Sequence, residues 1–239
     1  MNKQSFMKAV ILCGGKGTRL SEETVSIPKP MVKIGDKPIL WHIMKSFSDY
    51  GISEFILAIG YKGNVIKKNN KLFSEFKSVQ IIDTGKETLT GGRILRLKKY
   101  LKEGENFFMT YGDGLSNINF SNLLDFHIGH KKKATVTAVH PPVRFGELNI
   151  EKEKVIKFEE KPQVKAGWIN GGFFVLNYDV LKYIKNDNTM FEREPLSNLS
   201  KEGELMAFKH KGFWQCMDTM RDKELLNKMF QQKKIPWLK

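Results

Sequence analysis

A short apolar run that enters a glycine-rich turn constrains this chain more than any other feature. The run from Lys8 to Cys13 is followed directly by glycines, which is typical of a buried strand in an α/β sheet. The turn itself, Gly14 to Leu20, reads Gly-Gly-Lys-Gly-Thr-Arg-Leu. At the carboxyl end of such a strand, glycines allow backbone N–H groups to approach phosphate oxygens closely. The segment therefore predicts a phosphate-binding turn, in which Arg19 and Lys29 supply cations that can brace a triphosphate.

Two common phosphate-binding loops fit this turn poorly. The dinucleotide-binding pattern needs a third small residue where this chain has Leu20, and it should run directly into a helix. The segment from Ser21 to Pro30 is instead polar and interrupted by prolines, which predicts a loop. The Gly-Lys-Ser/Thr signature of the P-loop does not occur in the chain. A purely structural turn is the alternative for the glycines taken singly, and Arg19 and Lys29 weigh against it.

Length and composition are those of a globular cytoplasmic protein. A chain of 239 residues can bury a sizeable core in one large α/β domain. No apolar run approaches the roughly 18 residues that cross a bilayer, and Met1 to Met7 lacks the features of a secretory signal. Cys13 and Cys216 each lie in an apolar strand and are most simply buried thiols in a reducing compartment. We expect no membrane partner.

The net charge of +14 comes from lysines spread along the chain in small groups such as Lys131 to Lys133. Binding of nucleic acid would favour a concentrated basic stripe with aromatic residues placed to stack bases. The excess of positive charge favours smaller polyanions, such as nucleotides and sugar phosphates, through electrostatic steering. We therefore expect no nucleic-acid partner, and we expect the lysine groups to be solvated.

Predicted strands and helices alternate along the chain, which indicates a mostly parallel sheet flanked by helices. In the first half, strands are expected over 54–59, 79–83 and 106–111, and helices over 38–50, 63–76 and 92–102. In the second half, strands are expected over 134–140 and 169–176, a hairpin over 147–158, and helices over 179–185, part of 192–200 and 219–231. We read a single domain, with a nucleotide-binding half over about 7–115 and a sugar-phosphate half over about 116–239.

Two aspartates follow apolar strands and are candidate metal ligands. Asp113 lies between Gly112 and Gly114 at the end of a buried strand, the edge at which open α/β sheets bind ligands. Asp218 ends an apolar run and precedes a helix. Two such carboxylates can hold one Mg²⁺, with water and phosphate oxygens completing its coordination. A turn residue and a helix cap are the alternatives, and the phosphate-binding turn favours the metal.

Further motifs suggest contacts with a sugar phosphate. Lys161, held by the following proline, can point at a phosphate, and the adjacent Glu160 can bond sugar hydroxyls. Taken alone, this segment would more simply be an exposed charged turn. Paired glycines after Asn170 lie inside a predicted strand, where close approach of a ligand or a bulge is the usual reason. Gly146 is a similar, weaker case. Thr90 begins a helix whose backbone donors face an incoming polar group, unless Thr90 is a plain cap.

The histidines and serines predict neither a metal centre nor nucleophilic catalysis. His127 and His130 are three residues apart on a predicted helix, without a suitably placed third ligand, so surface or capping roles are expected. No Gly-x-Ser-x-Gly elbow accompanies them.

Taken together, these motifs closely resemble the bacterial glucose-1-phosphate cytidylyltransferases, a branch of the sugar-phosphate nucleotidyltransferases. The resemblance runs from Met7 to Trp237 and is carried by GGKGTRLSEET, PKPMVKIGDKPILWHIMK, GYKG, DTG, TGGR, TYGDG, RFGEL, FEEKP, INGGFFVLN, EPL, GELMAF and GFWQCMDTMRDK. It implies a Rossmann-like, GT-A-like nucleotidyltransferase fold, Mg²⁺ dependence and a homo-oligomer. The implied reaction joins CTP and glucose 1-phosphate into CDP-glucose, for surface polysaccharide, and releases pyrophosphate.

The resemblance also implies roles for individual residues. Catalytic roles fall on Arg19, Lys29, Asp113 and Lys161, and metal ligation on Asp113 and Asp218. Nucleotide binding is implied for Leu12, Cys13, Gly14, Gly15, Lys16, Gly17, Thr18, Arg19, Lys29, Thr90, Arg93 and Gly112. Binding of the sugar phosphate is implied for Gly146, Glu160, Lys161, Asn170 and Gly171.

One segment departs from the family pattern. Between Gly63 and Asp83, typical members carry a few dozen more residues than this chain, in a region near the nucleotide that bears on subunit packing. The oligomeric state, the base and the sugar therefore stay open. The alternatives are the same chemistry with dTTP, UTP or another phosphorylated acceptor, and a non-catalytic nucleotide-sugar sensor.

The sequence predicts different effects for Arg19 and for the lysine group 131–133. Loss of one charge-assisted phosphate contact costs about 1.5–3 kcal/mol, or roughly 10- to 150-fold. Steering by solvated lysines is largely screened at about 0.15 M salt. We expect Arg19→Ala to cripple turnover at any ionic strength, and triple replacement of the lysines by alanine to matter slightly and only at low salt. Equal losses at physiological salt, measured by steady-state kinetics, would contradict the placement of the phosphate site.

Overall fold

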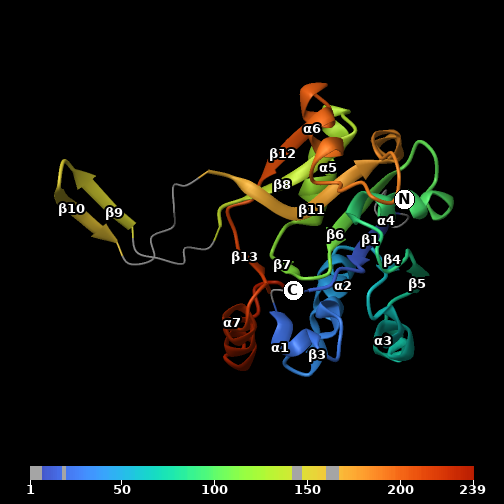
Figure 1. Ribbon diagram of the computed structural model, residues 1–239, viewed down its shortest axis with the longest axis horizontal. Coiled ribbons are helices and arrows are strands. Elements are labelled where there is room, and N and C mark those ends of the chain that lie inside the picture. Colours follow the sequence, from blue (N-terminus) through green and yellow to red (C-terminus); the bar gives the residue numbers. More distant parts are fainter. Residues whose placement is uncertain (1–6, 18–19, 142–146, 160–166) are drawn as a thin grey trace.

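A seven-stranded mixed sheet forms the centre of the computed structural model, which describes residues 7–17, 20–141, 147–159 and 167–239 (Figure 1). The strand order is β12-β8-β11-β6-β1-β4-β5, and every neighbouring pair is parallel except those made by β11. The strands are β1 (Lys8–Cys13), β4 (Glu54–Ile59), β5 (Ser78–Asp83), β6 (Asn106–Tyr111), β8 (Ala134–Val139), β11 (Ile169–Asn177) and β12 (Leu205–Lys209). This confirms the expected mostly parallel α/β sheet.

The chain also contains helices and three small two-stranded sheets. The α-helices are α1 (Ser21–Thr24), α2 (Ile39–Ser48), α3 (Gly63–Lys68), α4 (Thr90–Arg96), α5 (Phe120–His130), α6 (Glu194–Lys201) and α7 (Met220–Gln231). The small sheets pair β2 (Lys33–Ile34) with β3 (Lys37–Pro38), β7 (Gly114–Ser116) with β13 (Trp214–Cys216), and β9 (Glu147–Glu151) with β10 (Lys154–Glu159). None of the described helices is both long and apolar enough to cross a membrane.

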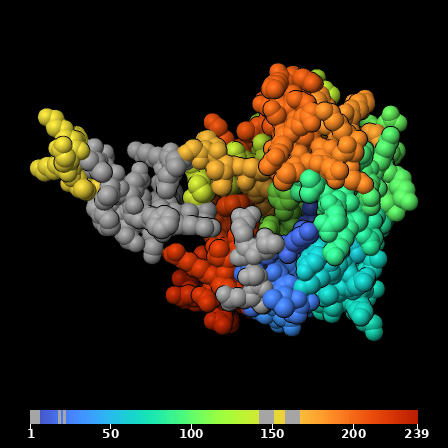
Figure 2. All heavy atoms as spheres, viewed as in Figure 1, coloured from blue at the N-terminus to red at the C-terminus, as the bar shows by residue number. Residues whose placement is uncertain are grey.

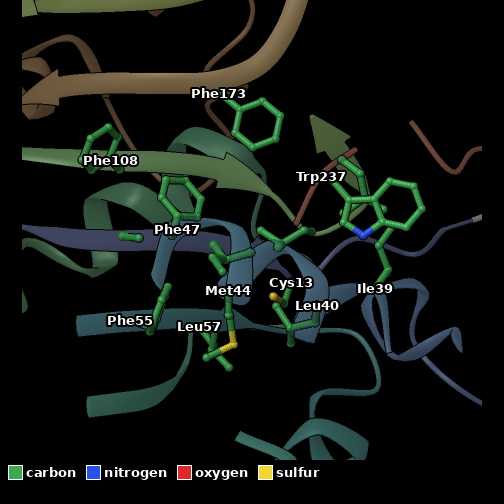
Figure 3. Close-up of a cluster of buried hydrophobic side chains, with 14 of the residues drawn as sticks. Cys13, Ile39, Leu40, Met44, Phe47, Phe55, Leu57, Phe108, Phe173 and Trp237 are labelled. Carbon is green, nitrogen blue, oxygen red and sulfur yellow. The ribbon is translucent and has the colours of Figure 1, made fainter. Parts of the chain in front are cut away.

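The two faces of the sheet carry separate hydrophobic cores. Successive residues of β1 point to opposite faces, so Ile11 and Cys13 pack in one core whereas Val10 and Leu12 pack in the other. Figure 3 shows part of the first core, where Phe47 of α2 lies among side chains of the central strands. Because both faces are covered, the central strands read as continuous apolar runs, which is why the sequence located them well.

The predicted strands are confirmed to within one or two residues, whereas three predicted helices were too long. The segments 63–76 and 92–102 contain 3₁₀ turns over Asn70–Phe73 and Lys98–Tyr100, and the segment 179–185 overlaps a 3₁₀ turn over Tyr178–Tyr183. At the first break, the Asn69 side chain donates to the carbonyl of Val65 at 2.8 Å, and such a local bond competes with helix continuation. The strand β12 was not predicted.

The loop predicted over Ser21 to Pro30 was wrong in part. The structure has a one-turn helix, α1, directly after Leu20, and a 3₁₀ turn over Lys29–Met31. The Thr24 hydroxyl closes the first turn by donating to the carbonyls of Leu20 at 2.9 Å and Gly17 at 3.1 Å. Polar composition alone did not reveal this short helix, because a single turn leaves no apolar periodicity.

The C-terminal segment packs against the first half of the chain, as the adjoining red and blue regions of Figure 2 show. The Trp237 indole donates to Nδ1 of the buried His42 at 3.2 Å, and the amide of Gly35 donates to Asn227 of α7 at 2.9 Å. Helix α7 begins with a full capping box between Thr219 and Asp222. This packing fixes the start of α7, and with it Asp218, beside the central strands.

A buried arginine ties together the ends of three strands. Arg93 of α4 donates to the Gly14 carbonyl after β1 at 2.9 Å, to the Ile59 carbonyl of β4 at 3.3 Å, and to the Gly85 carbonyl after β5 at 2.7 Å. It also donates to the Thr84 hydroxyl at 2.8 Å. A Cβ atom on Gly14 would lie 2.2 Å from the guanidinium group, and one on Gly60 would lie 2.3 Å from it. These two glycines are therefore needed where the arginine passes, independently of any ligand.

Replacement of Arg93 should destabilise the protein in the absence of any nucleotide. Arg93→Met leaves several buried acceptors unpaired, so the free energy of unfolding should fall by about 3 kcal/mol, which lowers Tm by roughly 6–12 °C. Arg96→Met is the matched control, because Arg96 is half-exposed and its ion-pair partner among the described residues is Asp187 on the surface; its loss should lower Tm much less. Equal thermal shifts for the two variants would contradict this role.

Candidate active site

A pocket of about 480 Å³ opens at the carboxyl ends of β1 and β6. Ligands of open α/β sheets bind at this edge. Of the residues expected to bind substrates or metal, the pocket lining contains Leu12, Cys13, Gly15, Gly17, Lys29, Thr90, Gly112, Asp113, Asn170, Gly171 and Asp218. Chain segments from both halves thus meet around one cavity.

Close backbone approaches bring these segments together. Gly112 lies so near Pro30 that a Cβ atom there would be 2.7 Å from the proline ring. Strand β13 pairs with β7, and the amide of Met217 donates to the carbonyl of Asp113 at 2.8 Å. These contacts place the 3₁₀ turn that carries Lys29 and the segment that carries Asp218 on either side of Asp113.

Lys29 bridges the two candidate metal ligands. Its ammonium lies 2.7 Å from Oδ2 of Asp113 and 2.5 Å from Oδ1 of Asp218. The lysine side chain is 10% exposed. Burial alone would lower the pKa of Lys29, but the charges and hydrogen bonds of the two carboxylates prevail and raise the pKa. The carboxylates of Asp113 and Asp218 therefore hold the positively charged ammonium of Lys29 between them.

The side chains around the Lys29 ammonium would also suit a hard divalent metal ion. Ligand atoms of Asp113, Cys216 and Asp218 lie within 4.8 Å of one another, the only such group among the described residues. Two carboxylates that converge on one point are typical ligands of Mg²⁺ and similar ions. Burial raises the pKa of the Cys216 thiol, and its soft sulfur is a donor that such a hard ion does not favour.

The start of β11 forms another wall of the pocket. A register shift between Asn170 and Phe174 marks a bulge against β8, and Gly172 has a φ of +78°, which favours glycine. A Cβ atom on Gly171 would lie 2.8 Å from the Val139 side chain. The bulge offered as one explanation of the paired glycines is therefore present, and it turns Asn170 and Gly171 toward the cavity.

The glycines after Thr90 serve a different purpose from the one expected. The amides of Gly91 and Gly92 donate to the carbonyl of Thr189, at 2.9 and 3.3 Å, and do not face the pocket. A Cβ atom on Gly92 would lie 2.5 Å from Asp187 backbone atoms. The expectation that these donors meet an incoming polar group was wrong, because the turn before α6 docks on them. Thr90 is the first residue of α4, and Leu89 holds the cap position.

Several pocket residues were missed by the sequence analysis, among them Tyr111, Glu192 and Cys216. Trp214 and Cys216 alternate with Asp218 along β13 and just beyond it, and this period of two was a usable signal. Tyr111 directly precedes Gly112 at the end of β6. Glu192 lies in a polar turn and carried no such signal.

Other expected ligands lie elsewhere or outside the described residues. Arg93 supports the glycine turn after β1 by donating a hydrogen bond to the Gly14 carbonyl. Lys16 forms an exposed ion pair with Glu87 at 2.9 Å. The placement of Thr18, Arg19, Gly146, Glu160 and Lys161 is outside the described residues.

Three smaller expectations need correction. Cys216 is only half-buried and lines the pocket, although Cys13 is buried as expected. His127 is buried rather than on the surface, and it shares the Thr135 hydroxyl with His130. Lys132 and Lys133 are half-buried and lie 3.7 and 3.6 Å from Glu204. Such pairing means that alanine at these lysines removes surface contacts as well as charge.

Comparison with known proteins gives one consistent family. The model of the family described as "Nucleotidyl transferase" matches residues 8–222. Glucose-1-phosphate cytidylyltransferase of Salmonella typhi is 50% identical over 253 residues, covering 97% of this chain and 98% of that protein. The probable glucose-1-phosphate cytidylyltransferase of Bacillus subtilis is 47% identical, with coverages of 97% and 99%. The Salmonella match spans more residues than the 239 of this chain, so that relative carries segments absent here.

Solved structures show the same fold. HddC from Yersinia pseudotuberculosis superposes with a TM-score of 0.76 at 27% identity, covering 94% of this chain and all of that one. A UDP-glucose pyrophosphorylase in complex with UDP-glucose has a TM-score of 0.71 at 18% identity, covering 95% of this chain and 99% of that one. The chain therefore belongs to the nucleotidyl transferase family, and it is an enzyme similar over 97% of its length to glucose-1-phosphate cytidylyltransferases.

Proposed function

We propose that this enzyme joins CTP and α-D-glucose 1-phosphate to give CDP-glucose and pyrophosphate. The observation that carries the proposal is the 50% identity to a glucose-1-phosphate cytidylyltransferase over 97% of the chain. The pocket is compatible with it, because a cavity of about 480 Å³ is lined by glycine backbone, Lys29 and two carboxylates that could share a metal ion with phosphate oxygens. CDP-glucose would then supply surface polysaccharide of the O-antigen type.

The chemistry needs charge and position rather than a covalent intermediate. A phosphate oxygen of glucose 1-phosphate attacks the α-phosphorus of CTP in line, the bond to the β-phosphate bridging oxygen breaks, and pyrophosphate leaves. The nucleophile is already an anion, so no general base is required. The enzyme must hold two polyanions together and offset their repulsion. We expect Lys29, Arg19 and Lys161 to share this task.

Asp113 and Asp218 would hold a Mg²⁺ ion. Members of this family generally use a divalent metal, and the paired carboxylates fit one. When bound, the ion would supply positive charge that orients and neutralises phosphate oxygens. The ammonium of Lys29 fills the space between the two carboxylates, so it must leave that position when the ion binds. The triphosphate offers the lysine a new anionic partner.

The remaining parts of the proposal concern the setting of the enzyme. We infer a cytoplasmic enzyme that works as a homo-oligomer and needs no nucleic-acid partner. The supporting observations are the similarity to biosynthetic relatives and the dispersed lysines.

Purified protein with CTP, glucose 1-phosphate and Mg²⁺ should release pyrophosphate, and chelation of the metal should abolish the release. The sharpest experiment crosses four nucleoside triphosphates with a panel of sugar 1-phosphates in one pyrophosphate assay. CTP with glucose 1-phosphate should have the highest kcat/KM. A higher kcat/KM with another pair would assign that nucleotide and that sugar phosphate as the substrates. If no pair releases pyrophosphate, the result would favour the non-catalytic nucleotide-sugar sensor.

The variant Asp113→Asn tests the metal ligand without disturbing the turn, because Asn-Gly is as good a turn pair as Asp-Gly. We expect the rate to drop about 10²-fold or more, comparable to the loss of one major electrostatic contact, and the Mg²⁺ requirement to rise. Thermal stability should hardly change, because Asp218 still pairs with Lys29.

Asp125→Asn, at an exposed position of α5, is the control and should behave as wild type. If Asp113→Asn unfolds while activity per folded molecule stays normal, the role of Asp113 is structural.

A further inference from the structure

A carboxylate on the wall of the pocket has no place in the phosphate chemistry. Glu192 lines the cavity from the turn before α6. Within the described part of the chain both of its partners are hydroxyl groups, and no lysine or arginine pairs with it. Two phosphorylated substrates would be repelled by this charge if their phosphates lay against it. The carboxylate must therefore face parts of the substrates that are neutral and carry hydrogen-bond donors.

The turn that carries Glu192 is built to hold it in place. Its backbone accepts hydrogen bonds from Leu89 and Gly91, each at 2.9 Å. Asp187 in the same turn forms a two-pronged ion pair with Arg96, with distances of 2.9 and 2.6 Å. The paired glycines of α4 allow this docking, because a Cβ atom at either position would collide with the turn. The position of Glu192 is thus set before any ligand arrives.

Two hydroxyl groups orient the carboxylate itself. Thr90 of α4 donates to Oε2 of Glu192 at 2.6 Å, and the Tyr111 hydroxyl donates to Oε1. Burial and the neighbouring carboxylate raise the pKa of Tyr111, so its hydroxyl remains a donor. An ionised carboxylate has about four acceptor sites. Two are occupied here, so each oxygen keeps capacity for one more donor.

The position of Tyr111 favours the acceptor sugar over the ribose of the nucleotide. Tyr111 ends β6, which lies between β1 with its glycine turn and β11 with Asn170. Asn170 lines the same pocket close to the Tyr111 side chain, so Glu192, Tyr111 and Asn170 form one polar wall. The Asn170 end of this wall lies on the side of β6 away from β1 and its glycine turn.

We propose that Glu192 is a specificity-determining residue, whose carboxylate accepts hydrogen bonds from hydroxyl groups of the hexose 1-phosphate. This inference rests on the proposed function, since it presumes a sugar phosphate acceptor. Thr90 and Tyr111 act as positioning residues that hold the carboxylate toward the sugar. A site built to bond a hydroxyl discriminates strongly against analogues that lack it, because the buried acceptor is then left without a donor.

The test compares wild type with Glu192→Gln by steady-state kinetics, using glucose 1-phosphate and its 2-, 3-, 4- and 6-deoxy analogues. Glu192→Gln should raise KM for glucose 1-phosphate roughly tenfold or more and leave KM for CTP within about twofold. Wild type should lose about tenfold or more in kcat/KM with at least one deoxy analogue, and Glu192→Gln should reduce that penalty to about twofold. Tyr111→Phe should give a smaller rise in the same KM.

Glu194→Gln is the matched control, because Glu194 is two residues further on, half-exposed and paired with Lys185; it should keep wild-type constants. Circular dichroism confirms that each variant is folded. A rise in KM for CTP alone would assign Glu192 to the ribose, and unchanged deoxy penalties would show a merely structural role; either result overturns the proposal.

Failure of the proposed function is distinguished by wild type itself. If wild type turns over a different substrate pair, the same comparison is made with that pair and its deoxy sugars. If no pair is turned over, glucose 1-phosphate alone is titrated calorimetrically into wild type and Glu192→Gln. Binding weakened tenfold by the substitution then upholds the assignment, and equal or absent binding refutes it.

Discussion

The ion cluster of Lys29, Asp113 and Asp218 is the interaction on which the site depends. It joins three segments that lie 84 and 189 residues apart along the chain. Without a cation between them, the two carboxylates would be costly to place so close together, because like charges at this separation repel. The buried ammonium removes that cost and holds the two acids in the arrangement that a divalent ion requires. The same charges that stabilise the free protein are therefore the ones that substrates and metal would rearrange.

Glycines around the site serve the protein as often as they serve a ligand. Gly14 and Gly60 make room for the Arg93 guanidinium, and Gly92 makes room for the turn that carries Glu192. Gly172 instead supplies a backbone conformation that most residues avoid. A glycine-rich motif in a nucleotide-binding fold thus combines close approach to ligands with close packing of neighbouring segments. The sequence alone does not tell which glycines serve a ligand and which serve packing; the three-dimensional structure does.

The pocket divides into two chemical environments. Around Asp113, charged groups and glycine-lined backbone suit phosphates and a metal ion. Toward β11, Asn170, Tyr111 and Glu192 form a neutral-to-anionic wall that suits hydroxyl groups. In the proposed reaction, the first environment offsets charge at the reacting phosphorus, and the second decides which sugar is accepted. Changes in substrate preference should therefore arise in the second environment without loss of the chemistry in the first.

The sequence by itself determined the buried strands, the glycine turn after β1, the aspartates at two strand ends and the cap of α7. These features depend on local physics, namely apolar runs, alternation, backbone freedom of glycine and the bond between Thr219 and Asp222. Tertiary structure alone decided that Lys29 lies between the aspartates, that Arg93 turns inward to backbone carbonyls, and that Glu192 enters the pocket. Each of these outcomes depends on which distant segment docks on which helix or strand end. Contacts of that kind leave no periodicity in the chain, so no local pattern could have revealed them.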